Sequence, residues 1–199
     1  MQTFVTSTHR LPIVAVMETA RHLDRARLGK QRVECKQIWT ALDTGKGWIH
    51  HPATKMWKGH SDTLASYGFL MCLEFSNRGY EDNLRQWFFE RSSPGENWPW
   101  WFRNNEMVAT HRSKLIRKLP EFYKKQFEYD FEASKYALPY IWPNPAVSGQ
   151  FSLSEAERLR INWEIPPRWH IGEDGTVTFD GDQRYRRASD DGVFYDEDE

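Results

Sequence analysis

The sequence predicts a mainly α-helical protein: a compact helical bundle, a small C-terminal extension with a β-hairpin, and an acidic tail. Apolar residues recur at helical spacing over several segments before residue 126, and cap residues mark helix ends. A strand-like pattern around a turn is found only at 169–179. The predicted organisation is therefore a helical domain at 1–145, an extension at 146–187 and a disordered tail at 188–199.

The helix predicted over 24–42 follows from its caps and its two faces. Asp24 is a preferred N-cap residue, and Gly45 follows the last apolar position, as is usual at a helix end. Gly29 inside this helix costs about 1 kcal/mol relative to Ala, so either the helix breaks there or another group approaches its backbone closely. The apolar stripe is Leu28, Cys35, Ile38, Trp39 and Leu42, and the other side carries Arg25, Arg27, Lys30, Arg32 and Lys36.

The same rules predict the remaining elements in chain order. Helices are expected at 11–23, 60–77, 82–89, 106–119 and 121–127, with a loop or short helix at 47–59, a loop at 92–101 and Pro120 as a break. Residues 138–145 are expected to be extended. Ser152 and Glu155 form a capping box that predicts a helix to about residue 163, and the Glu-Asp-Gly turn predicts a hairpin at 169–179.

The charge of the chain is divided unevenly. The formal net charge is −1, but residues 1–125 carry 20 Lys and Arg against 12 Asp and Glu, whereas residues 126–199 carry 7 against 16. Such asymmetry favours a nucleic-acid-binding body with an acidic extension. The alternative is a mildly basic domain with a solvated tail.

Several classes of protein are excluded by composition. No apolar run approaches the roughly 20 residues of a membrane span, and the N-terminus lacks the features of a signal peptide. Two cysteines make no disulfide framework, so we expect an intracellular, cytoplasmic protein. His50, His51 and His60 have no carboxylate or cysteine at ligand spacing, so no metal site is predicted.

Four blocks of sequence, in order and spacing, resemble one family. They are HLDRARLGKQRVECKQIW, HPATKMWKG, a helix closing in NRGY, and THRSKLIRKLPEFY. The family is that of the pyrimidine-dimer DNA glycosylases of the phage and bacterial endonuclease V type, and the resemblance covers about residues 1–145. It implies a compact all-α monomer that binds duplex DNA, flips a nucleotide, cuts a glycosidic bond and cleaves the backbone by β-elimination. It implies no cofactor, because an amine and a carboxylate suffice.

Glu34 is the first candidate for the carboxylate. Arg27, Lys30 and Glu34 share one helix face, which would keep the acid ionised near bound phosphate. The alternative is that Lys30 and Glu34 form an ordinary surface pair. Glu18, four residues before His22, is the rival acid. His22 and Leu23 match a dipeptide of the family's first helix. An ungapped match then places Gly29 at the position of the family's catalytic Glu, and a match with an insertion places Glu34 there.

Three alternatives are open for the identity of the nucleophilic amine. In the family it is the α-amine of a small residue exposed by removal of Met, and an α-amine suits the task because its ordinary pKa of about 7.7–8.0 leaves a neutral fraction at pH 7. Here residue 2 is Gln, whose size should block that removal. Met1 supplies the amine, or a lysine such as Lys30 does, or the lyase step is absent.

The candidate DNA contacts are cations, histidines and an aromatic residue. The pattern in 111–118 packs Leu115 and Ile116 inward and presents cations to phosphates, or forms a solvated helix face. Trp98, Trp100 and Trp101 are expected in the core rather than as a wedge in DNA. The predicted contacts are Arg25, Gln31, Arg32, His51, Lys55, Trp57, Lys58, His60, His111, Arg112, Lys114, Arg117 and Lys118.

The leading hypothesis is therefore a DNA N-glycosylase, with or without an abasic-site lyase step, acting on a damaged or modified pyrimidine. A second hypothesis keeps the scaffold but assigns it to pyrimidine hypermodification of the phage type. A third is a non-enzymatic DNA-binding or DNA-mimicking module whose acidic tail regulates partners.

Overall fold

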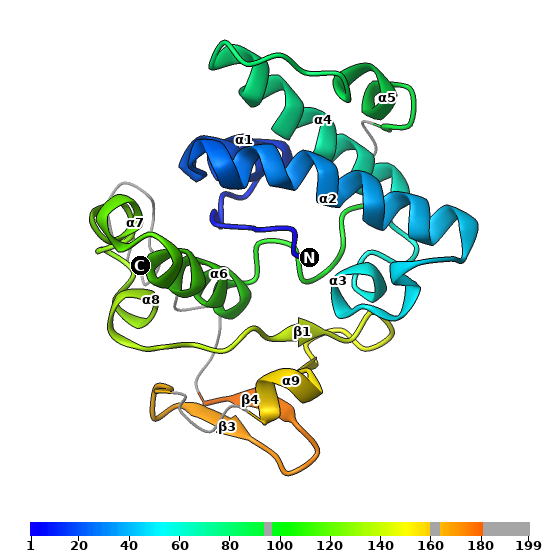
Figure 1. Ribbon diagram of the computed structural model, residues 1–199. Helices are drawn as coiled ribbons and strands as arrows, with labels where there is room; N and C mark the ends of the chain where they lie inside the picture. Colours follow the sequence, from blue (N-terminus) through cyan, green and yellow to red (C-terminus); the bar gives the residue numbers. More distant parts are fainter. Residues whose placement is uncertain (94–96, 160–163, 181–199) are drawn as a thin grey trace, which may run out of the picture.

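The computed structural model describes residues 1–93, 97–159 and 164–180. Within these ranges the chain is mainly helical, as predicted, with a small sheet near the C-terminal end (Figure 1). The acidic tail predicted at 188–199 lies outside the described residues. The helices are α1 Pro12–His22, α2 Arg25–Thr44, the 3-10 turn η1 Trp48–His50, α3 Pro52–Lys55, α4 Ser61–Asn77, α5 Arg85–Phe89, α6 Asn105–Lys118, α7 Pro120–Gln126, α8 Phe131–Lys135 and α9 Glu155–Arg158.

Helix α2 begins and ends where its caps predict. The Asp24 carboxylate accepts hydrogen bonds from the backbone N–H groups of Ala26 and Arg27, and Gly45 closes the helix in the left-handed conformation, with φ of 66°. The helix continues through Gly29, and the Phe75 ring of α4 lies 3.4 Å from the place where a Cβ would be. The helix therefore does not break at Gly29, and the Phe75 ring packs beside it at an ordinary contact distance.

The N-terminal segment is extended and buried, although no local sequence pattern predicts this. It runs between α2 and α6 (Figure 1), and residues 2–7 are buried. Because buried backbone groups need partners, side chains of the surrounding helices supply them in place of a neighbouring strand. Thr19 of α1, for example, accepts a hydrogen bond from the Thr6 N–H at 3.0 Å.

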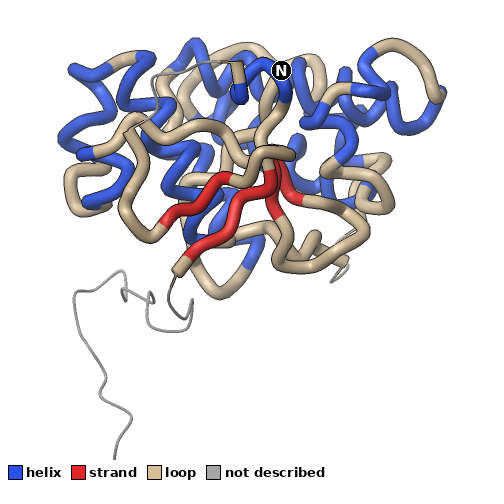
Figure 2. The backbone as a smooth tube through the Cα atoms, turned by 90° about the horizontal axis from the view of Figure 1, so that it is seen from below, coloured by secondary structure: helices blue, strands red, loops and turns tan. Residues whose placement is uncertain are grey.

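The sheet joins four short antiparallel strands in the order β1-β2-β4-β3. Figure 2 shows these strands on one side of the molecule, with the helices behind them. The hairpin predicted at 169–179 is confirmed by β3 and β4, with Trp169 opposite Phe179. The strands are β1 Trp142–Pro143, β2 Phe151–Ser152, β3 Trp169–Ile171 and β4 Thr176–Phe179.

The predicted capping box is wrong by two residues. Ser152 lies in β2, and Ser154 instead caps α9 by accepting a hydrogen bond from the Glu157 N–H at 3.3 Å. Helix α9 ends at Arg158, and residues 160–163 lie outside the described ranges. Pairing with β1 and β4 takes Ser152 into the sheet, so tertiary contacts decide between two similar capping sequences.

The C-terminal extension packs on the helical body. Phe151, Trp169 and Val177 belong to the same buried apolar cluster as the helices. Arg168 forms ion pairs with Glu132 of α8 at 2.7 Å and with Glu106 of α6 at 3.2 Å, and both carboxylates are buried. The extension is thus joined to the bundle by apolar contacts and by paired charges.

Tryptophans of the loop 92–101 lie in the core, as expected. Trp101 is buried and its indole N–H donates to the Met56 carbonyl at 3.0 Å, while Trp98 and Trp100 pack against the core from its edge. The Trp100 indole N–H also reaches the Asn144 carbonyl at 3.2 Å, so this loop helps to hold the chain near β1.

Candidate active site

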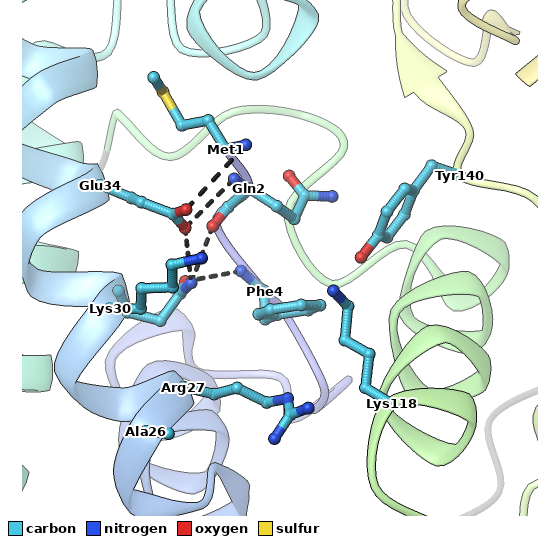
Figure 3. A pocket seen from close by; sticks show the side chains of 10 residues that line it. Met1, Gln2, Phe4, Ala26, Arg27, Lys30, Glu34, Lys118 and Tyr140 are labelled. Atoms are coloured by element: carbon cyan, nitrogen blue, oxygen red, sulfur yellow. Dashed lines mark hydrogen bonds and ion pairs between the residues drawn. The ribbon is translucent and has the colours of Figure 1, made fainter. Parts of the chain in front are cut away.

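A pocket of about 360 Å³ lies where the N-terminal segment passes between α2 and α6. Figure 3 shows α2 on one side of it and Lys118 with Tyr140 on the other. Charged and aromatic groups therefore face each other across a space of the size of a small ligand. The pocket is lined by Met1, Gln2, Phe4, Ala26, Arg27, Lys30, Gln31, Glu34, Lys118 and Tyr140.

The Glu34 carboxylate lies beside the amine of the first residue. The Met1 amine is 4.0 Å from Glu34 Oε1, and the Gln2 N–H donates to Glu34 Oε2 at 3.3 Å (Figure 3). The Glu34 side chain is 15% exposed, so it is accessible from the pocket and shielded from bulk water. The Met1 amine and the Glu34 carboxylate are thus held next to each other.

Gln31, predicted to contact DNA, holds this arrangement in place instead. Its side chain is buried, accepts a hydrogen bond from the Phe4 N–H at 2.9 Å, and donates to the Gln2 carbonyl at 2.8 Å and to Glu34 at 3.4 Å. The Tyr67 hydroxyl of α4 donates to Gln31 Oε1 and to the Phe4 carbonyl. The amide thereby fixes both the N-terminal segment and the carboxylate.

His111, also predicted to contact DNA, is fully buried on α6 and holds the N-terminal segment from the opposite side. Its Nδ1 lies 2.9 Å from the Val5 nitrogen, and its Nε2 lies 2.7 Å from the Gln2 side-chain nitrogen. Burial lowers the pKa of His111 to about 3, so the ring is neutral at pH 7. This prediction is corrected because a fully buried ring is not available to DNA.

Three cations line the pocket. Arg27 and Lys30 extend from α2, and Lys118 extends from the end of α6 (Figure 3). Arg27 is held by Asp24 at 2.7 Å, whereas Lys30 and Lys118 are exposed. With the Met1 amine, these cations outnumber the single carboxylate, Glu34, in the pocket lining, which favours an anionic ligand such as a phosphodiester.

Tyr140 completes the pocket and was not singled out from the sequence. It follows α8 in the chain, and its ring lies 4.7 Å from the Lys114 Nζ and 5.8 Å from the His111 ring. Burial is the main cause of a raised pKa of its hydroxyl, and Glu157 contributes to it. The phenol is therefore a neutral hydrogen-bonding group at pH 7. Nothing in the local pattern of LPYIWPNP distinguishes it from a core aromatic.

Three more predicted DNA contacts are buried cations. Arg32 pairs with Asp82 at 2.8 Å and stacks on Phe75, with its Cζ 3.7 Å from the ring centre. Arg112 donates to the Thr6 carbonyl and to Asp130, and Lys114 pairs with Glu157 at 3.3 Å. At 7–8% exposure these side chains bind other parts of the protein, so the prediction that they reach phosphates is corrected.

Trp57 is likewise buried rather than a stacking platform. Its indole N–H donates to the Thr3 hydroxyl at 2.8 Å, and its ring packs on Trp101 at 5.0 Å between centroids. Through this hydrogen bond, the HPATKMWKG block helps to hold the N-terminal segment in place. The prediction of a DNA contact at Trp57 is corrected for the same reason, namely full burial.

The other predicted contacts lie at the surface or near it. Lys55 and Lys58 are exposed around α3, and Arg25 is exposed at the start of α2. Arg117 is partly engaged, since its guanidinium donates to the Ser113 hydroxyl and the Leu138 carbonyl, and burial lowers its pKa. These residues stay predicted DNA contacts, and they lie outside the pocket lining.

His51 and His60 have local structural partners. His51 caps α3 by accepting from the Ala53 N–H at 3.1 Å, and its pKa is lowered by burial and by the positive charge of the N-terminal amine. His60 bonds to the Asn97 carbonyl at 2.8 Å. No group of three metal-binding side chains occurs in the described part of the chain.

The rival acid and its partner lie apart from the pocket lining. Glu18 accepts a hydrogen bond from the Ser7 hydroxyl, and His22 bonds to the Thr6 hydroxyl at 2.9 Å. Burial lowers the pKa of His22 to about 4, and Arg112 adds to the effect. Of the two candidate acids, Glu34 is the one beside the amine.

The site is of the amine–carboxylate class, lined by cations and carried on a helical fold. In comparison with known families, the model for pyrimidine dimer DNA glycosylases matches residues 1–87, which confirms the resemblance for that part of the chain. The matched part includes the N-terminal segment and α2, whereas Lys118 and Tyr140 lie beyond it. No curated protein and no solved structure matched the chain.

None of the helices in the described ranges is both long enough and apolar enough to cross a membrane.

Proposed function

We propose that this protein is a DNA glycosylase, with an associated lyase step, that acts on a damaged or modified pyrimidine in duplex DNA. The observation that carries the proposal is the contact between the Met1 amine and Glu34 in a cation-lined pocket, within the part of the chain that matches the glycosylase family. The reaction needs a nucleophilic amine and a carboxylate at one sugar, and both are present.

In the proposed reaction the neutral amine attacks C1′ of the target nucleotide. The bond between C1′ and the base nitrogen breaks, and the base leaves with the bonding electrons and takes up a proton. The Glu34 carboxylate stabilises the positive charge that develops on the sugar. Ring opening then leaves a Schiff base between the amine and C1′, and loss of a C2′ proton expels the 3′ phosphate by β-elimination.

The geometry supports an amine from either of the first two residues. Met1 N lies 4.0 Å from one oxygen of Glu34, and Gln2 N lies 3.3 Å from the other. If Met1 were removed after all, the new amine of Gln2 would already be next to the acid. Lys30, which lines the same pocket, is the remaining candidate nucleophile.

The cations are proposed to bind the phosphates on either side of the reacting sugar. Arg27 and Lys30 lie on the α2 side and Lys118 on the other side, so a strand in the pocket would pass between them (Figure 3). Contacts of this kind orient the strand without reading its sequence. The Tyr140 hydroxyl is proposed to complete the wall that faces the nucleotide.

The test is base release and strand cleavage, scored separately, on duplexes that contain a pyrimidine dimer or one of a panel of damaged and modified pyrimidines. Glu34→Gln should lower base release at least about 100-fold and leave DNA affinity within about threefold. Glu18→Gln is the matched control, because it changes a carboxylate outside the pocket lining, and it should retain activity.

Borohydride trapping identifies the amine. Reduction during turnover should join the protein to DNA through the N-terminal peptide, and intact-mass measurement should show which residue comes first. An adduct on Lys30 would contradict the assignment of the nucleophile. Absence of base release from every duplex would contradict the proposed function.

A further inference from the structure

A second hollow lies further along α2, beyond the pocket. Its volume is about 520 Å³, and it lies between the second half of α2, the turn at η1 and the loop before α5. Lys30 and Glu34 line the pocket, while Val33 and Gln37, three residues further on, line this groove. The two hollows therefore lie on successive parts of the same helix. The groove is lined by Arg32, Val33, Lys36, Gln37, Thr40, Ala41, Lys46, Gly47, Trp48, Asn83 and Leu84.

Trp48 stands at this groove with its side chain exposed. Its exposed fraction is 57%, in a protein whose Trp57 and Trp101 are buried. The loop that presents it turns twice at glycines, since Gly45 has φ of 66° and Gly47 has φ of 71° with ψ of −119°. These conformations favour glycine, so the sequence TGKGW is suited to projecting an indole into solvent.

A series of ring contacts connects Trp48 with the pocket. The distance between ring centroids is 5.9 Å from Trp48 to His51 and 6.0 Å from His51 to Trp142. It is 5.9 Å from Trp142 to Tyr140. The positive charge of the N-terminal amine contributes to the lowered pKa of His51, and Tyr140 lines the pocket. The exposed indole is thereby braced against the wall of the candidate active site.

The charges around the groove match a nucleic-acid strand. Lys36 and Lys46 lie among its lining residues, and the charge of Arg32 is held there by Asp82 at 2.8 Å. Val33, Ala41 and Trp48 add apolar side chains to the same lining. Such a lining suits a nucleobase, whose flat face can stack on the indole while the lysines contact the phosphates on either side.

We propose that this groove accepts an unstacked nucleobase, which stacks on Trp48. The base belongs to the same DNA strand as the sugar in the pocket and lies next to it or one nucleotide further along. This inference rests on the proposed function, because it takes DNA as the ligand of the pocket. It adds a positioning residue outside the amine–carboxylate pair, one that holds the strand while the neighbouring nucleotide reacts.

The experiment places 5-iodouracil at each of the positions flanking the target and irradiates the complex with a Glu34→Gln protein, which holds DNA without cleaving it. A crosslink mapped by mass spectrometry to Trp48 is expected at one flanking position and at no position on the opposite strand. Trp48→Phe should retain crosslinking within about threefold at that position, and Trp48→Ala should lose it.

A companion measurement uses the active protein. Trp48→Ala should weaken duplex binding about tenfold, whereas Phe89→Ala, which removes another aromatic that is 61% exposed, should leave it unchanged. Base release without any crosslink at Trp48 would overturn this inference and leave the proposed function standing. Absence of both base release and DNA binding would overturn the proposed function as well.

Discussion

Helices α2 and α6 are both rich in Lys and Arg, yet cations of α2 line a pocket whereas cations of α6 are buried. On α2, Arg27 and Lys30 line the pocket, and Lys30 is exposed. On α6, Arg112 and Lys114 are buried and bind the N-terminal segment and the C-terminal extension. The difference arises because α6 is covered by the chain on both sides, whereas one face of α2 is open. A row of cations therefore does not by itself indicate a surface for DNA.

The largest expected effect comes from removing a buried charge of α6. Arg112→Met leaves Asp130 without its partner and the Thr6 carbonyl without its two donors. We expect the free energy of unfolding to fall by about 3 to 5 kcal/mol. Chemical denaturation followed by circular dichroism measures this change.

The matched change on α2 is Lys30→Met. The free energy of unfolding should stay within about 0.5 kcal/mol, while the slope of log affinity for DNA against log salt concentration should decrease by about 0.9. Equal loss of stability in the two variants would contradict the contrast between the helices.

A more gradual loss of stability is expected from acid, and it acts on the interior around α6. The folded-state pKa of His111 is about 3 and that of His22 is about 4, both below the ordinary value of 6.5. The unfolded chain thus binds more protons below pH 6.5, so stability is complete above that pH and falls as the pH decreases toward 3. Each ring contributes a slope of roughly 1 kcal/mol per pH unit in this window.

Denaturant midpoints measured from pH 7 to pH 4 check this expectation. In His111→Gln, whose side chain does not titrate, the slope should be smaller, although the variant is less stable at pH 7. An unchanged slope would show that His111 is not a neutral buried ring.

The smallest expected effect concerns the glycine inside α2. A Cβ at Gly29 would lie 3.4 Å from the Phe75 ring, an ordinary contact, so Gly29→Ala should stabilise the protein by about 0.5 to 1 kcal/mol through helix propensity. Gly68→Ala on α4 is the contrasting variant, because its Cβ would come within 2.5 Å of the buried Phe88 ring and should destabilise the fold. Thermal unfolding of both variants tests the pair, and equal effects would refute it.

Local signals explain which parts of the fold were predictable. The caps at Asp24 and Gly45, the break at Pro120 and the hairpin at 169–179 depend on residues close in sequence, and each is present. The choice of Ser154 over Ser152 as a cap depends on pairing with strands elsewhere, and the prediction failed there.

The candidate site likewise contains residues that local sequence patterns could group and residues that only the fold brings together. Arg27, Lys30 and Glu34 share a helix face, and helical spacing alone was enough to group them. Tyr140 and Lys118 come from segments more than 80 residues away, so no spacing rule connects them with Glu34. His111 and Gln31 have polar side chains that suggest DNA contacts, and only their burial against the N-terminal segment shows another role.

What the sequence determined by itself is the helical class, the helix that carries Glu34, and the resemblance that the family match confirms over residues 1–87. The first two follow from patterns that repeat within about one or two turns of helix, and the resemblance follows from blocks of sequence in order. What only the tertiary structure decided is that the N-terminal segment is threaded between α2 and α6, which brings an amine to Glu34 and turns polar residues of both helices inward. The reason is physical: an extended, buried backbone must satisfy its hydrogen bonds wherever partners are available, and those partners are distant in sequence.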